Sequence, residues 1–144
     1  MEDFKYCIWF TPEKEHEWNK YTNGFSPHMT IKSKLSKSSL KDFNNIISSN
    51  KKIKVRLVGK LYQTQLNDFY SLQYDVEPIN NDEIPDWWPS NAHISFKYKY
   101  ILPYIDDEIR NIDNEIKIKE GILDTISIYK CSGDFSTWKK YIYT

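Results

Sequence analysis

His28-Met29-Thr30-Ile31 and His93-Ile94-Ser95-Phe96 are two copies of one pattern: histidine, apolar residue, hydroxyl residue, apolar residue. Successive side chains of a β-strand point to opposite faces. We therefore expect the histidine, the hydroxyl residue and the following lysine (Lys32 or Lys97) of each copy on one face, and the apolar residues and Tyr98 on the other. Two imidazoles and two hydroxyls on equivalent strands predict an acid–base pair with two hydrogen-bond donors.

A single copy of this pattern would be read as an ordinary strand histidine. The two copies use two of the three histidines in the chain, which favours a functional role. The third, His16, lies in the polar stretch 11–17 and has no hydroxyl at the matching position. We interpret His16 as a solvated surface residue.

The two motifs resemble the signature of the 2H phosphoesterase superfamily, which has a His-x-Thr/Ser motif in each half of one domain. The blocks 27–31 and 91–96 carry the resemblance, 65 residues apart from histidine to histidine. Phe96 departs from it, because many members have a smaller aliphatic residue there. The resemblance implies two pseudo-symmetric lobes around a central cleft, with His28, Thr30, His93 and Ser95 as catalytic residues. We expect these four side chains to point into solvent-filled space and to make few core contacts.

The order of the predicted elements agrees with an α+β fold of antiparallel sheets and flanking helices. Strand, motif strand, helix and strand occur twice in the chain. Strands are expected at 4–10, 28–35, 53–57, 61–76 (with a turn near 65–68), from 93, at 122–129 and at 134–143. Helices are expected from Ser38-Ser39, with Leu40, Phe43 and Ile47 on one face, and from Pro103, with a stripe of isoleucines. A long loop is expected from Glu77 to Ser90.

The 144 residues fit a single domain, 1–144, and 40% apolar residues exclude general disorder. There is no apolar run long enough for a membrane span, and the first residues do not resemble a signal peptide. Cys7 and Cys131 offer no disulfide framework and are expected to be reduced and buried. We therefore predict a cytoplasmic protein, with a monomer as the default state.

The net charge is zero, but the charge is unevenly distributed. Residues 28–60 hold nine basic residues and one acid, and residues 61–116 hold three basic residues and eleven acids. This asymmetry favours a small anionic ligand on one side of a cleft and does not favour a long nucleic acid. Solvated faces that happen to differ in charge are the alternative.

The predicted site needs neither a metal nor a cofactor, because the chain has no cluster of metal-ligating residues at ligand spacing. Nucleobases would stack on aromatic rings. The candidates are Trp87 and Trp88, followed by Trp9 and Tyr6, with core packing as the alternative for each. Lys32 and Lys97 are candidates for offsetting phosphate charge, or are solvated residues.

The resemblance implies a metal-independent phosphodiesterase. A short chain whose abundant lysine, isoleucine and asparagine look like an AT-rich coding bias is similar to the members that erase immune second messengers. The expected substrate is a small nucleotide, either a cyclic dinucleotide such as 2′,3′-cGAMP or a 2′–5′ oligoadenylate, in the host cytoplasm if the source is viral. Action on 2′,3′-cyclic phosphates at RNA ends or on cyclic mononucleotides is the alternative. A non-catalytic nucleotide-binding module is the alternative from another class of protein.

Overall fold

The computed structural model describes residues 4–22, 25–49, 51–65, 69–80, 84–131 and 135–141. The strands are β1 (Tyr6–Pro12), β2 (His28–Leu35), β3 (Ile53–Gln65), β4 (Phe69–Pro78), β5 (His93–Tyr100), β6 (Glu120–Lys130) and β7 (Lys139–Tyr141). The α-helices are α1 (Asn44–Ile47) and α2 (Asp106–Glu115). The 3₁₀ helices are η1 (Glu17–Tyr21), η2 (Lys37–Phe43) and η4 (Phe135–Thr137).

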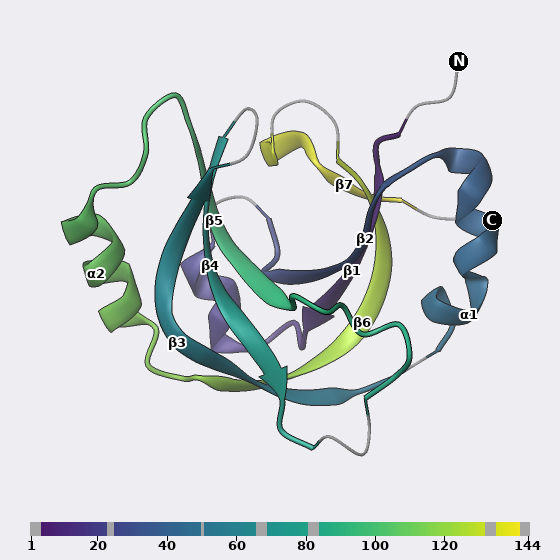
Figure 1. Cartoon of the computed structure of the whole chain (residues 1–144), viewed down its shortest axis with the longest axis horizontal. Helices are drawn as coiled ribbons and strands as arrows, with labels where there is room; N and C mark the ends of the chain where they lie inside the picture. Colours follow the sequence, from purple (N-terminus) through teal and green to yellow (C-terminus); the bar gives the residue numbers. More distant parts are fainter. Residues whose placement is uncertain are drawn as a thin grey trace.

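The strands form one sheet in the order β1-β2-β5-β4-β3-β6-β7, and every pairing is antiparallel. β1 also pairs with β6, so the first six strands in this order close into a ring (Figure 1). An antiparallel sheet with separate helices confirms the predicted α+β class. None of the helices among the described residues is both long and apolar enough to cross a membrane.

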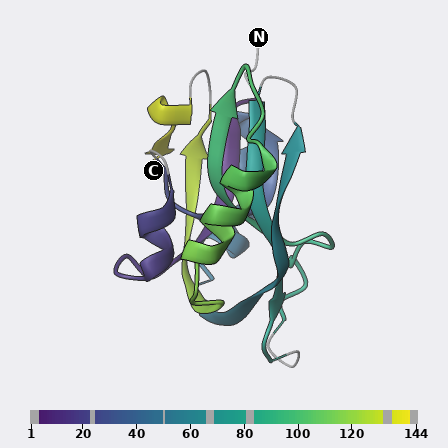
Figure 2. The same ribbon diagram turned by 90° about the vertical axis from the view of Figure 1, so that its left-hand side faces the viewer.

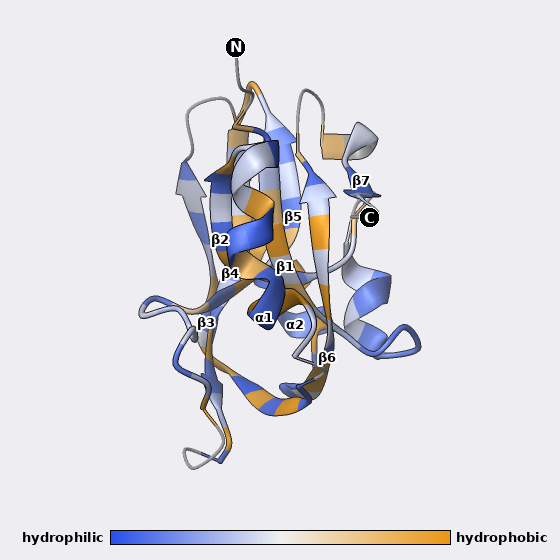
Figure 3. Cartoon of the chain, turned by 90° about the vertical axis from the view of Figure 1, so that its right-hand side faces the viewer, coloured by the Kyte–Doolittle hydropathy of each residue, from blue (hydrophilic) through white to orange (hydrophobic). Residues whose placement is uncertain are grey.

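β3 shows how the sequence selects a half-buried strand. Ile53, Val55 and Leu57 are buried, whereas Lys54 and Arg56 between them are exposed. This period of two matches the alternation of faces along a strand. Figure 3 shows hydrophobic and hydrophilic residues alternating along β3 and β6. The prediction for this segment is confirmed.

α1 and α2 lie outside the ring of strands, on opposite sides of it (Figure 1). α1 contacts β6 and α2 contacts β3, and Figure 2 shows α2 in front of the strands. The first predicted helix begins as the 3₁₀ helix η2 after Ser36, and only its last four residues form α1. Leu40 is buried as expected, but Phe43 and Ile47 are only half-buried, and Ile46 is the buried residue of α1.

α2 begins at Asp106, three residues after the predicted start at Pro103. The backbone N–H of Ile105, the N-cap residue, donates to the carboxylate of Glu108 in the first turn (3.1 Å), and this hydrogen bond caps the helix. Acids in the first turn also interact favourably with the helix dipole. The start is therefore set by Glu108 and not by the proline.

The connections differ from the prediction in two places. β3 runs unbroken from Ile53 to Gln65, where separate strands were expected at 53–57 and from 61. β4 extends through Pro78, where a loop was expected from Glu77, because Pro78 still pairs with Val55 of β3. The turn expected near 65–68 lies mostly outside the described residues. Of the last expected strand, 134–143, only 139–141 form β7 among the residues described.

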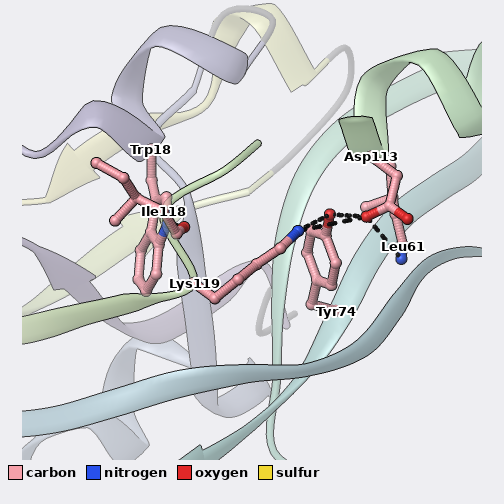
Figure 4. A network of polar contacts seen from close by, with 6 residues as sticks. All are labelled: Trp18, Leu61, Tyr74, Asp113, Ile118 and Lys119. Atoms are coloured by element: carbon pink, nitrogen blue, oxygen red, sulfur yellow. Dashed lines mark hydrogen bonds and ion pairs between the residues drawn. The ribbon is translucent and has the colours of Figure 1, made fainter. Parts of the chain in front are cut away.

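Trp18 of η1 is fully buried in the hydrophobic core, edge-on to Phe96 of β5. Its indole Nε1 donates to the Ile118 carbonyl at 2.7 Å (Figure 4). His16 accepts a hydrogen bond from the Trp18 backbone N–H at Nδ1 and thereby caps η1. The interpretation of His16 as a solvated residue is therefore wrong: it is half-buried and holds the turn that carries Trp18.

A second polar cluster ties α2 to the sheet. Tyr74 of β4 donates to the Asp113 carboxylate of α2, which also accepts from the Leu61 backbone N–H (Figure 4). Lys119 lies 3.0 Å from the Tyr74 hydroxyl and 3.5 Å from the carboxylate. Burial and Asp113 raise the pKa of Tyr74, so the phenol stays a donor. These bonds satisfy the polar atom of a buried ring.

The register of β1 with β2 recurs in β4 with β5. In both ladders one residue of the motif strand is skipped directly after the hydroxyl residue, Ile31 in β2 and Phe96 in β5. The corresponding pairs are Phe10↔Met29 and Tyr74↔Ile94, Trp9↔Thr30 and Gln73↔Ser95, and Ile8↔Lys32 and Leu72↔Lys97. The two motif strands therefore share a local geometry as well as a sequence pattern.

Candidate functional site

The two motif strands are direct neighbours in the sheet. β2 and β5 pair antiparallel, with His28 opposite Ser95 and Met29 opposite Ile94. On this register Thr30 lies in line with His93. Side chains opposite one another on a shared face have Cβ atoms about 4.5–5.5 Å apart. The structure therefore brings the four residues predicted to be catalytic into one patch of the β2–β5 ladder.

Both imidazoles are anchored in the same way. Nδ1 of His28 lies 2.8 Å from the Ser26 carbonyl, and Nδ1 of His93 lies 3.1 Å from the Asn91 carbonyl, in each case two residues upstream. A carbonyl only accepts, so Nδ1 carries the hydrogen and Nε2 of the neutral ring carries a lone pair. Nε2 is therefore the proton-transferring atom of both rings.

His28 is enclosed by aromatic rings. Trp9 of β1 stacks on it with 3.5 Å between ring centroids and an interplanar angle of 5°, and Phe25 meets it edge-on. The Tyr98 hydroxyl lies 3.1 Å from Nε2 and donates to it, since Nδ1 already holds the ring hydrogen. The Ser95 hydroxyl bonds to the same phenol. His28 and Ser95 thus share Tyr98 as a partner.

The enclosure sets the protonation state of His28. Burial is the main cause that lowers the pKa of His28 to about 3; the Ser26 carbonyl opposes this effect, and the nearby His93 adds to it. His28 is therefore neutral at pH 7.

The expectation that all four side chains point into solvent is wrong for half of them. His28 and Ser95 are only 1% and 5% exposed, whereas Thr30 and His93 are partly exposed. Phe25, three residues before His28, covers one side of its ring. Trp138, which is distant in sequence, packs edge-on against both Trp9 and Tyr98.

Lys97 and Tyr98 lie on the opposite faces of β5 from those that strand alternation predicted. Simple alternation would put Lys97 on the face of His93 and Ser95. The residue skipped at Phe96 reverses the alternation, so Tyr98 faces His28 instead. In β2, Ile8 pairs with Lys32, so Lys32 also leaves the line of His28 and Thr30. Neither lysine lies where strand alternation predicted.

The predicted aromatic residues are divided between the two faces of the sheet. Trp9 joins the site. Tyr6 is buried in the hydrophobic core, and Trp87 and Trp88 pack against that core, with Trp87 edge-on to Phe10. Only Trp9 of these four lies beside His28.

Two polar residues beside the site were not predicted, because nothing in the sequence places β4 next to β5. Asp75 pairs with His93, and Gln73 pairs with Ser95. The Tyr62 hydroxyl donates to Asp75 (2.5 Å), and the Gln73 amide donates to the Tyr62 hydroxyl (3.0 Å). Hydrogen-bonding groups therefore border the site on the β4 side, and aromatic rings border it on the β1 side.

The cysteines lie close together at the β1–β6 ladder. Cys7 pairs with Tyr129, and the Cys7 and Cys131 thiols hydrogen-bond to each other. Both are free, as predicted, but each is half-buried and not fully buried. The contact lowers the pKa of Cys7 and raises that of Cys131.

A cavity of about 690 Å³ lies between β3 and α2, lined by Lys60, Tyr62, Arg110 and Asp113 among others. It does not include the motif residues. Across the described residues, no three His, Cys, Asp or Glu side chains gather as a metal site.

The buried histidine makes stability depend on pH. Below the ordinary histidine pKa of 6.5 the unfolded chain binds a proton at His28, but the folded protein does not until the pH approaches 3. Stability is therefore lost as the pH falls through this window, by about 1.4 kcal/mol per unit. In urea unfolding at pH 7 and pH 5, we expect wild type to lose about 2 kcal/mol more than His28→Gln.

His28→Gln is the matched variant because its amide can donate to the Ser26 carbonyl and accept from Tyr98 without titrating. Equal losses in the two proteins between pH 7 and pH 5 would contradict the buried neutral state of His28.

Comparison with models of protein families found no match for this chain, and a search of curated proteins found none either.

Proposed function

We propose that this chain is a metal-independent phosphodiesterase that uses His28 and His93 as an acid–base pair. The observation that carries the proposal is the shared patch on β2 and β5, in which each imidazole is anchored through Nδ1 and keeps Nε2 for proton transfer. Cleavage of a phosphodiester needs a base for the attacking oxygen and an acid for the leaving oxygen. Thr30 and Ser95 then donate to the phosphoryl oxygens as charge develops.

The proposal includes two pseudo-symmetric lobes that face each other across a cleft. The recurring register supports it: β1 and β2 correspond to β4 and β5, including the skipped residue. The positions of the helices support it too. α1 follows β2 and contacts β6 from the second half of the chain, whereas α2 follows β5 and contacts β3 from the first half.

The proposed substrate is a small nucleotide messenger, either a cyclic dinucleotide or a 2′–5′ oligoadenylate. The rings of Trp9 and Tyr129 border the site on one side, and the polar residues Gln73 and Asp75 border it on the other. A ligand with both bases and phosphates matches this division into aromatic and polar groups. A long RNA would gain little, because the chain has no net positive charge from which counterion release could supply affinity. A role in removing immune messengers in a host cytoplasm is part of the same proposal.

One observation favours a non-catalytic nucleotide-binding module as the second candidate. Tyr98 occupies Nε2 of His28, and Trp9 and Phe25 cover the ring. Catalysis requires the phenol to give way to substrate, whereas a binding module does not.

Activity is tested by incubating the protein with chelator present and identifying products by chromatography. The panel holds 2′–5′ oligoadenylate, 2′,3′- and 3′,3′-linked cyclic dinucleotides, 2′,3′-cyclic mononucleotides and RNA ending in a 2′,3′-cyclic phosphate. We expect cleavage of a small messenger with long single-stranded RNA left intact. Activity only on RNA ends would favour the end-processing alternative. Binding without turnover would favour the binding module, and loss of activity with chelator would refute metal independence.

A further inference from the structure

The two histidines of the site occupy opposite environments, although their sequence motifs are alike. His28 is enclosed by rings and faces a phenol, and His93 is partly exposed and lies opposite a carboxylate. We propose that His28 is the general base and His93 the general acid, an assignment that rests on the proposed phosphodiesterase activity.

The first argument is the hydroxyl already seated at His28. Nε2 accepts a hydrogen bond from Tyr98, whose oxygen in turn bonds to the Ser95 hydroxyl. A nucleophilic water or ribose hydroxyl must make the same bond, donating its hydrogen to Nε2 of the base. A phosphoryl oxygen has no hydrogen and cannot be held by a lone pair. The phenol oxygen therefore marks the position that the nucleophile takes when it displaces Tyr98.

The second argument is the charge state that each environment favours. The titratable groups that influence His28 and Tyr98 are His93, Cys7 and Cys131, with Tyr129 on the adjoining β6. None of these is a carboxylate, and Trp9 and Phe25 exclude water. This favours a neutral ring, which is the form that a base requires.

His93 has the opposite surroundings. It pairs with Asp75 across the β4–β5 ladder, and the ring is partly exposed. Asp75 therefore places a carboxylate on the same face of the ladder as the His93 ring. Within the part of the chain that the structure describes, Nε2 of His93 makes no hydrogen bond, so this atom is open to the leaving oxygen.

The resulting step balances. The nucleophile's O–H proton passes to Nε2 of His28 while its oxygen bonds to phosphorus. The bond from phosphorus to the leaving oxygen breaks, and that oxygen takes the proton from Nε2 of His93. Solvent exchange afterwards returns His28 to the neutral form and His93 to the protonated form.

The roles of base and acid can be separated with 4-nitrophenolate, a leaving group that departs without being protonated and therefore needs no general acid. The first substrate is an adenylyl adenosine in the linkage that wild type cleaves, and the second is an adenosine 4-nitrophenyl phosphodiester on the same hydroxyl. We expect His93→Gln to lose about 10²–10⁴ in kcat on the first substrate and less than about tenfold on the second. His28→Gln should lose about 10²–10⁴ on both, because the nucleophile needs its base in either case.

The opposite pattern, with His28→Gln rescued by the activated leaving group, would reverse the roles. Rescue of both variants or of neither would overturn the assignment as well. If wild type cleaves neither substrate, the proposed function itself fails, and this outcome is distinct from the other three. Circular dichroism shows whether each variant is folded.

Discussion

His93→Gln is expected to lower kcat on the proposed messenger substrate by about 10²–10⁴, the usual effect of removing a general acid or base. His93 is partly exposed at the patch shared by β2 and β5, and its ring contributes little to the buried core. The loss should therefore appear in turnover while the urea midpoint stays close to that of wild type. Steady-state kinetics on the substrate identified by the panel measures the change.

The third histidine supplies the control. His16→Asn also removes an imidazole, but position 16 caps η1 away from the site, and asparagine is a good N-cap residue. We expect His16→Asn to keep kcat within about threefold of wild type, since its ring bonds to the Glu120 carbonyl and the Trp18 backbone and lies against the Trp18 ring. A folded His93→Gln protein with near-normal kcat would show that His93 is not catalytic.

Trp18→Ala is expected to cost about 3–5 kcal/mol of unfolding free energy, the range for removing a large buried aromatic side chain. The indole is fully buried, meets Phe96 edge-on and donates to the Ile118 carbonyl. Its loss leaves a cavity and an unsatisfied buried carbonyl. Urea unfolding followed by circular dichroism measures the change, and Phe4→Ala is the control because Phe4 is 64% exposed.

Gly121 tests the same contact from the other side. A Cβ at position 121 would lie 2.8 Å from the Trp18 ring and 2.9 Å from Nε2 of His16. Gly121→Ala should therefore cost about 1–3 kcal/mol in wild type and clearly less in the Trp18→Ala background. Equal costs in the two backgrounds would show that the added methyl group does not clash with the Trp18 ring.

The sequence by itself determined the features that depend on local chain geometry. The alternation in the motif strands predicted that each histidine shares a face with its hydroxyl residue, and the apolar spacing predicted β3 and the buried Leu40. These predictions need only the period of a strand or helix, which is fixed by the backbone. The order of elements was likewise sufficient for the α+β class.

Only the tertiary structure decided what surrounds the motifs. The skipped residue at Phe96 arises from the pairing of β5 with β4, and it brings Tyr98 to Nε2 of His28 in place of Lys97. The stacking of Trp9 on His28 and the pairing of Asp75 with His93 join residues of different strands. Such contacts depend on which strands become neighbours, which no local period encodes. For this reason the two like motifs have unlike environments, one buried and neutral, the other partly open and beside a carboxylate.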